Sequence, residues 1–197
     1  MKVCIYCASS IKSKKIYVDA VTHLGKTFAE KGHSLVYGGG DSGLMGAAAR
    51  GFKEGGGHVT AIIPRFFPDG EVTCAKCDEV IYTDTMRQRK QLMEDNADVF
   101  VMAPGGIGTL DEFFEILTLR QLGRHNKAIV VYNINGYYDS FIKLMQNIVD
   151  EDFAKEHTLA LYKVVSDESE LIDYIESYEP EDIDMSHTNY VSENKDV

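Results

Sequence analysis

The segment DVFVMAPGGIGTLDEFFEILTLRQLG, residues 98–123, contains the pattern that decides the fold. Its first part, residues 98–104, is an apolar run without alternation, which predicts a strand buried on both faces of a sheet. Three glycines in four residues follow this run, and residues 108–123 then carry apolar side chains at helical spacing. The segment therefore predicts a strand, a glycine turn and a helix, the unit from which parallel α/β sheets are built.

The same alternation recurs along the rest of the chain. Apolar strands are expected at 2–8, 33–40, 58–64, 78–83 and 127–133, with helices at 14–32, 43–56, 85–97, 137–152 and 167–177. This order predicts a doubly wound, Rossmann-like α/β fold, in which a mostly parallel sheet carries helices on both faces. Neither a repeat nor a linker interrupts the pattern, so we expect residues 1–178 to form one domain.

The acidic residues are concentrated at the C-terminal end. Residues 167–197 contain eleven Asp or Glu and one Lys, whereas residues 1–166 are nearly neutral. Residues 179–197 also lack periodicity, so we expect an acidic, disordered tail there. The body shows no basic face for nucleic acid, no apolar run of ~18 residues for a membrane, and no signal peptide. We therefore expect a cytoplasmic protein that binds neither nucleic acid nor membrane.

Four cysteines form two C-x-x-C pairs, Cys4 with Cys7 and Cys74 with Cys77. A zinc ribbon separates its pairs by roughly 15 to 20 residues, whereas 66 residues lie between these two pairs. Cys4 and Cys7 also fall on a predicted strand, where residues three apart point to opposite faces. We therefore expect buried, hydrophobic roles for these thiols rather than a zinc site.

Residues 38–43, GGGDSG, match the letters of the dinucleotide-binding pattern G-x-G-x-x-G. In a dinucleotide enzyme the pattern follows the first strand, and an acid about 20 residues later binds the ribose. Here it follows the second strand, and the next strand ends in Ile63-Pro64-Arg65 without an acid. The pattern thus favours a loop of close backbone approach over an NAD site, with tight packing of the following helix as an open alternative. The glycines concerned are Gly38, Gly39, Gly40 and Gly43.

The loop PGGIGT, residues 104–109, is a candidate anion site. Glycines let backbone N–H groups face an anion, and the helix that follows adds a favourable dipole, so a phosphate fits there. The same residues also fit an ordinary helix start, because Thr109 and Glu112 form a T-x-x-E capping box. Spacing alone therefore leaves Glu112 as either a helix-capping residue or a catalytic carboxylate.

The stretch MRQRK places Arg87, Arg89 and Lys90 at the start of a predicted helix. Cations oppose the dipole at a helix N-terminus, which indicates a nearby anion such as a phosphate or Glu112, with a solvated basic turn as the alternative. Ligands of open α/β sheets lie beyond the carboxyl ends of the strands. We therefore expect this stretch and the two glycine loops to meet in one crevice.

Several motifs in this chain occur in the order found in one known family. They are CASS at 7–10, YGGGDSGLMG at 37–46, MRQRK at 86–90, PGGIGTLDEFFEILTLRQLG at 104–123 and NINGYYDS at 133–140. The chain resembles the Lonely Guy family of cytokinin riboside 5′-monophosphate phosphoribohydrolases, many of which were once mislabelled lysine decarboxylases. The combination of Arg-Lys with P-G-G-x-G-T-x-x-E is the specific part of this resemblance.

The resemblance implies a reaction and its catalytic pair. The reaction is hydrolysis of the N-glycosidic bond of a purine nucleoside 5′-monophosphate, carrying adenine or an N6-modified adenine, to free base and ribose 5-phosphate. Arg89 and Glu112 are the implied catalytic residues, and neither a cofactor nor a metal is implied. The further substrate contacts implied are Glu71, Lys90, Gly105, Gly106, Ile107, Gly108, Thr109 and Thr118.

The resemblance also implies a homodimer, which agrees with the nearly all-round apolar character of the predicted helix over residues 110–122. The chain departs from the family pattern at Ala8, Arg87 and Leu119-Arg120. These departures leave Arg89 and Glu112 unchanged and bear on which base is accepted.

A non-catalytic carrier of a nucleotide or nucleotide cofactor is the alternative function, because fold alone does not determine function. The pair of Arg89 and Glu112 favours a phosphoribohydrolase over a carrier, because a carrier has no evident need for such a pair. A decarboxylase is disfavoured because the sequence offers no clear pyridoxal-phosphate site.

Overall fold

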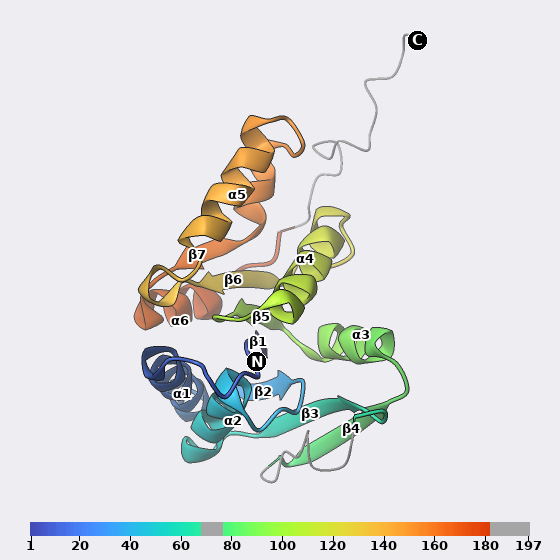
Figure 1. Cartoon of the computed structure of the whole chain (residues 1–197), viewed down its shortest axis with the longest axis vertical. Coiled ribbons are helices and arrows are strands. Elements are labelled where there is room, and N and C mark those ends of the chain that lie inside the picture. Colours follow the sequence, from blue (N-terminus) through green and yellow to red (C-terminus); the bar gives the residue numbers. More distant parts are fainter. Residues whose placement is uncertain (68–76, 182–197) are drawn as a thin grey trace.

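Seven parallel strands form one sheet in the computed structural model, which describes residues 1–67 and 77–181 (Figure 1). Their order is β4-β3-β2-β1-β5-β6-β7, so the direction of winding reverses between β1 and β5. The predicted doubly wound α/β fold is confirmed, and every strand pair is parallel. The strands are β1 Lys2–Tyr6, β2 Ser34–Tyr37, β3 Val59–Pro64, β4 Glu79–Thr83, β5 Val99–Met102, β6 Ala128–Tyr132 and β7 Lys163–Val165.

Helices cover both faces of the sheet (Figure 1). The α-helices are α1 Lys15–Glu30, α2 Gly43–Glu54, α3 Met86–Asn96, α4 Ile107–Gln121, α5 Asp139–Asp150 and α6 Glu168–Ser177, with 3-10 turns at η1 Ile134–Gly136 and η2 Glu156–Leu161. Alternate residues of β1 belong to two separate cores. Val3 and Ile5 pack with α1, α2 and α6, whereas Cys4 and Tyr6 pack with α3, α4 and α5.

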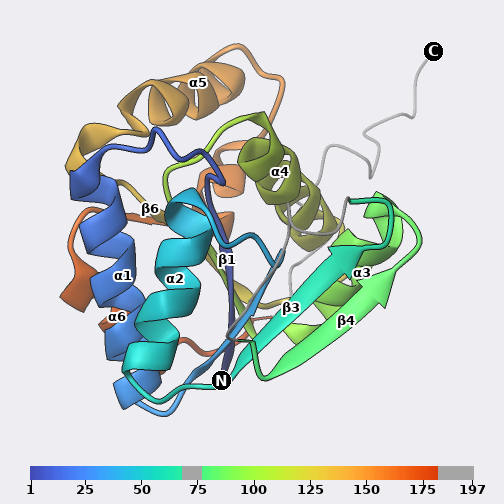
Figure 2. The same cartoon turned by 60° about the horizontal axis from the view of Figure 1, so that its bottom comes forward.

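Small residues bring α1 and α2 into close contact, side by side on one face of the sheet (Figure 2). A Cβ atom on Gly25 of α1 would lie 2.8 Å from the carbonyl oxygen of Ala48 in α2, and one on Gly51 would overlap the carbonyl oxygen of Thr22. Gly25 and Gly51 therefore let the backbones of the two helices approach closely.

Two strands differ from the sequence expectation. The segment Lys163–Val165 forms β7, which is too short for its pattern to be recognised in the sequence. Strand β4 is expected to be buried on both faces, yet Val80 and Tyr82 are exposed because β4 is the edge of the sheet.

The cysteine prediction is confirmed for the first pair, since Cys4 and Cys7 are buried on opposite faces of the sheet. Within residues 1–67 and 77–181, no group of three His, Cys, Asp or Glu side chains is placed to hold a metal ion. The described helices also include none that is long and apolar enough to cross a membrane. Cys74, Glu71 and residues 182–197 of the predicted tail lie outside the described residues.

Candidate active site

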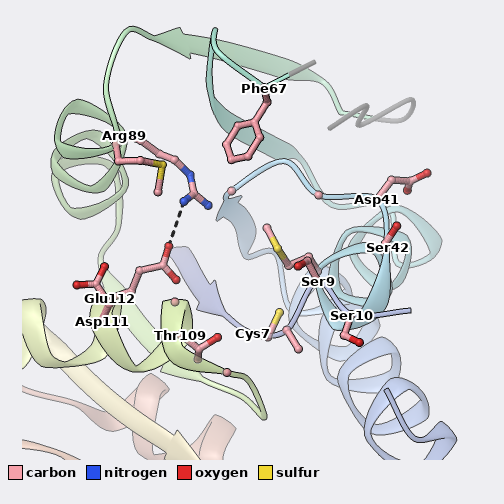
Figure 3. Close-up of a pocket in the computed structure, with 17 residues that line it drawn as sticks. Cys7, Ser9, Ser10, Asp41, Ser42, Phe67, Arg89, Thr109, Asp111 and Glu112 are labelled. Carbon is pink, nitrogen blue, oxygen red and sulfur yellow. Dashed lines mark ion pairs between the residues drawn. The ribbon is translucent and has the colours of Figure 1, made fainter. Parts of the chain in front are cut away.

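A cavity of about 580 Å³ opens at the carboxyl ends of the strands, beside the point where the winding reverses (Figure 3). Residues that follow β1, β2, β3 and β5 line it together with the start of α3, so the predicted meeting of these motifs is confirmed. Its volume lies within the range of ordinary small-molecule sites. The lining residues are Cys7, Ala8, Ser9, Ser10, Gly38, Gly40, Asp41, Ser42, Met45, Phe67, Met86, Arg89, Gly106, Gly108, Thr109, Asp111 and Glu112.

An ion pair between α3 and α4 forms one wall of this cavity. The Nη1 atom of Arg89 lies 3.4 Å from the Oε1 atom of Glu112, and Figure 3 shows the two side chains directed at each other. Both are largely buried, with side-chain exposures of 10% and 12%. The neighbouring Phe113 is fully buried against the rings of Phe141 and Tyr162, which fixes the orientation of α4. Glu112, one position earlier on the helix, is thereby held toward the cavity.

The path of the Arg89 side chain depends on a glycine at the end of β2. A Cβ atom on Gly38 would overlap the Nη2 atom of Arg89, so any other residue there would displace the guanidinium. The Nε atom of Arg89 also donates to the carbonyl oxygen of Ile62 in β3, at 3.3 Å. The absence of a side chain at Gly38 therefore leaves room for the guanidinium group of Arg89. The sequence did not indicate this role.

Burial raises the pKa of Glu112 from its usual 4.5 to about 7. Loss of hydration is the largest cause, and the positive charge of Arg89 opposes it. The negative charge of Asp111 raises this pKa further, while the positive charge of Lys90 lowers it. A carboxyl group with a pKa near neutrality can give and take protons at physiological pH, which is the property that general acid–base catalysis needs.

The first turn of α4 contradicts the predicted capping box. The helix begins at Ile107 with Gly106 as its N-cap, so Thr109 and Glu112 lie inside the helix and do not cap it. Hydrogen bonding along the helix starts at Leu110, whose backbone N–H donates to the carbonyl oxygen of Gly106. Glu112 is therefore free of the capping role.

The earlier N–H groups of the turn, at residues 106–109, meet no acceptor in the described part of the chain. Gly106, Gly108 and Thr109 line the cavity, and a Cβ atom on Gly106 or Gly108 would meet no protein atom within 4 Å. Unpaired N–H groups at a helix N-terminus favour an anion. This turn therefore has the properties expected of an anion site.

The second glycine loop, residues 38–43, also contributes to the cavity lining, but the helix N-terminus that follows it is paired within the protein. The N–H groups of Leu44 and Met45 both donate to the carbonyl oxygen of Ala8, so the N-terminus of α2 is already occupied. A Cβ atom on Gly43 would lie 2.6 Å from the carbonyl oxygen of Ser10. Gly38 and Gly40 line the cavity, whereas Gly39 does not. The expectation of close backbone approach agrees with this geometry.

The remaining contacts implied by the resemblance are not all brought to the cavity. Lys90 does not line it, because its Nζ atom pairs with Glu115 at 2.8 Å and with Asp111 at 3.2 Å. Thr118 is exposed near the far end of α4 and also lies outside the lining. Gly105 is buried and does not line the cavity, and Ile107 is 84% exposed.

Several lining residues were not expected as site residues. Ser9 and Ser10 follow β1, and Ser42 follows β2, so the rule that places ligands beyond strand ends gives a signal for these three. Phe67 and Met86 add apolar surface; Met86 begins the MRQRK stretch that was expected at the crevice, whereas no sequence pattern points to Phe67. Arg87 is exposed and lines a separate surface groove with Tyr82 and Leu92.

The fold and cavity define a parallel α/β protein that brings a buried carboxylate and the N-terminus of a helix together at its topological switch point. A family model described as "Possible lysine decarboxylase" matches residues 45–175. Curated relatives extend this match over nearly the whole chain. The chain belongs to this family, which includes the cytokinin riboside 5′-monophosphate phosphoribohydrolases.

Two such relatives come from plants. The chain is 37% identical over 191 residues to cytokinin riboside 5′-monophosphate phosphoribohydrolase LOG2 of Arabidopsis thaliana, covering 97% of this chain and 87% of the relative. It is 39% identical over 180 residues to the LOG phosphoribohydrolase of Oryza sativa, covering 91% of this chain and 74% of the relative. These similarities support a nucleotide phosphoribohydrolase activity for the chain.

Solved structures with the same fold carry other functions. A molybdenum cofactor binding protein from Rippkaea orientalis aligns with a TM-score of 0.68 and 19% identity, over 89% of this chain and 95% of its own. The molybdenum cofactor carrier protein of Chlamydomonas reinhardtii aligns with a TM-score of 0.67 and 21% identity, over 89% of this chain and 95% of the carrier protein. At such identities the likeness concerns the fold alone.

Proposed function

We propose that the protein hydrolyses the N-glycosidic bond of a purine nucleoside 5′-monophosphate, whose base is adenine or an N6-modified adenine. The products are the free base and ribose 5-phosphate. The observation that carries this proposal is the buried pair of Arg89 and Glu112, in the same cavity as the unpaired N-terminus of α4. A carboxylate and an anion site together suit a phosphorylated sugar whose reacting carbon becomes positive.

The phosphate binds at the start of α4 in this proposal. Its charge is favoured by the helix dipole and by the N–H groups at residues 106–109, for which the described chain offers no acceptor. Binding the phosphate, which takes no part in the bond cleavage, supplies free energy that positions the sugar. The C1′ carbon of the ribose then lies toward Glu112, one to two turns further along the helix.

Glu112 acts on the glycosidic bond. When the C1′–N bond breaks, its electron pair leaves with the base, and the sugar develops the charge of an oxocarbenium ion. The ionised carboxylate stabilises that positive charge and accepts a proton from the water that attacks C1′. This proton then passes to the departing base, which regenerates the ionised carboxylate. Arg89 holds this carboxylate in place and lowers its pKa against the effect of burial.

Two other functions are less well supported. A pyridoxal-phosphate decarboxylase forms a Schiff base between the cofactor and a lysine, and the described residues that line the cavity include no lysine. A carrier of a nucleotide or nucleotide cofactor needs the anion site but not the desolvated carboxylate. The raised pKa of Glu112 therefore favours an enzyme over a carrier.

The proposal is tested by incubating the protein with AMP and with isopentenyl-AMP and separating the products by chromatography. We expect free base and ribose 5-phosphate in equal amounts from at least one of them. The Glu112→Gln protein, which keeps the shape of the side chain, is the control for contaminating activity. Binding of both nucleotides without release of base would support the carrier instead.

A further inference from the structure

Residues 133–138 form a turn that places two tyrosines side by side. Asn135 and Gly136 have φ angles of 51° and 70°, in the left-handed region that asparagine and glycine tolerate best. The side-chain oxygen of Asn133 accepts a hydrogen bond from the backbone N–H of Tyr138, at 2.7 Å. Tyr137 and Tyr138 leave this turn with their ring centroids 4.8 Å apart.

Both tyrosine hydroxyls donate to carbonyl groups in the segment that leads into α4. The Oη atom of Tyr137 donates to the carbonyl oxygen of Gly105 at 2.7 Å, and the Oη atom of Tyr138 donates to that of Ala103 at 2.8 Å. The ring of Tyr137 also packs edge-on against Tyr17 of α1, with centroids 5.5 Å apart. Neither tyrosine lines the cavity, so these contacts reach the loop from behind.

The bond from Tyr137 fixes one particular peptide unit. In a trans peptide, the carbonyl of one residue and the N–H of the next point in opposite directions, and no described peptide is cis. Because the Gly105 carbonyl points to Tyr137, the N–H of Gly106 points away from Tyr137. Gly106 itself lines the cavity. A peptide between two glycines is otherwise free to rotate, since neither residue has a Cβ atom.

We propose that Tyr137 is a positioning residue, whose hydroxyl holds the Gly105–Gly106 peptide so that its N–H faces the substrate phosphate. This inference rests on the proposed function, because it assumes that the phosphate binds at the start of α4. If this peptide rotates, the Gly105 carbonyl oxygen turns toward the phosphate and repels it. The hydroxyl therefore contributes to phosphate binding without touching the substrate.

The adjacent tyrosine provides a matched control. Tyr138 makes the same kind of hydrogen bond, but its acceptor belongs to the peptide between Ala103 and Pro104. Proline has no N–H group, so the orientation of that peptide presents no donor to a ligand. Loss of the Tyr138 hydroxyl leaves a carbonyl without its bond and affects the fold, but it does not remove a phosphate donor.

The experiment compares Tyr137→Phe and Tyr138→Phe with the unsubstituted tyrosines, all in the Glu112→Gln background so that bound AMP is not hydrolysed, using calorimetric titration with AMP, ribose 5-phosphate and adenosine. Both substitutions keep the aromatic ring and remove one hydroxyl. For Tyr137→Phe we expect Kd to rise about 10-fold for the two phosphorylated ligands, the scale of one hydrogen bond to a charged group, and to stay unchanged for adenosine. For Tyr138→Phe we expect a lower Tm and an unchanged ratio of the AMP and adenosine Kd values.

Three results would overturn the inference. They are unchanged AMP binding by Tyr137→Phe, an equal loss of AMP binding in Tyr138→Phe, and a wild-type protein that binds none of the phosphorylated ligands. The proposed function fails on a different observation. It fails if the wild-type protein binds AMP but releases no free base from AMP or from isopentenyl-AMP. The Kd comparison still tests the role of Tyr137 in that case.

Discussion

The raised pKa of Glu112 predicts that this residue destabilises the folded protein above neutral pH. Its pKa rises from 4.5 in a solvated chain to about 7 in the fold, a difference that corresponds to about 3 kcal/mol at 1.36 kcal/mol per pKa unit. The folded state binds the proton more tightly than the unfolded state. Stability contributed by protonated Glu112 is therefore lost as the pH rises from about 4.5 to about 7, and the loss is complete above that.

The substitution Glu112→Gln isolates this effect, because glutamine does not titrate. The free energy of unfolding of the variant, minus that of the wild type, should grow by about 2.5 kcal/mol between about pH 5 and about pH 8. For a chain of this size, that corresponds to a relative Tm difference of roughly 5–10 °C. The measurement is urea denaturation followed by circular dichroism, at both pH values and one ionic strength.

A neighbouring carboxylate provides the control for this measurement. The Asp111 side chain is 58% exposed, so Asp111→Asn should change the free energy of unfolding by well under about 1 kcal/mol at both pH values. If Glu112→Gln gave the same stability difference at both pH values, Glu112 would not have a raised pKa, and the reasoning from burial would be wrong. In the wild type, kcat/KM should rise by about tenfold from about pH 6 to about pH 8 if ionised Glu112 is the active form.

Four further predictions concern the site and the assembly. Glu112→Gln and Arg89→Ala should each lower kcat by about 10²-fold or more, and the double variant should be little worse, since the two groups act as a unit; additive losses in kcat would separate their roles. Adenosine should have a far lower kcat/KM than AMP, and equal values would exclude phosphate binding at the start of α4. Gly108→Ala should keep or raise Tm, because alanine favours a helix, but should weaken AMP binding by placing a methyl group in the cavity, so unchanged AMP affinity would argue against this site. Light scattering should report a homodimer of about 44 kDa, twice the 22.0 kDa chain, because apolar side chains of α4 such as Leu110 and Phe114 are only partly buried; a monomer would contradict it.

The sequence alone predicted the fold class and the edge of the sheet at which the site lies. Apolar runs and helical spacing are local patterns, and residues 98–123 contain a complete strand, loop and helix of the kind observed. Parallel strands then bring their carboxyl ends to one edge whatever the details of packing. For this reason the motifs around Gly38, Arg89 and Glu112 were expected in one crevice before any contact was known.

Only the tertiary structure decided that Glu112 does not cap its helix and is buried beside Arg89. Its spacing from Thr109 fitted a helix cap equally well, until α4 was found to begin at Ile107. The contact with Arg89 and the loss of hydration that raises the pKa depend on a second helix and on the absence of a side chain at Gly38. Lys90, adjacent to Arg89 in sequence, pairs with the acids of α4 instead of lining the cavity. Local sequence determines backbone conformation, whereas ion pairing and desolvation depend on atoms that the fold brings together from distant positions.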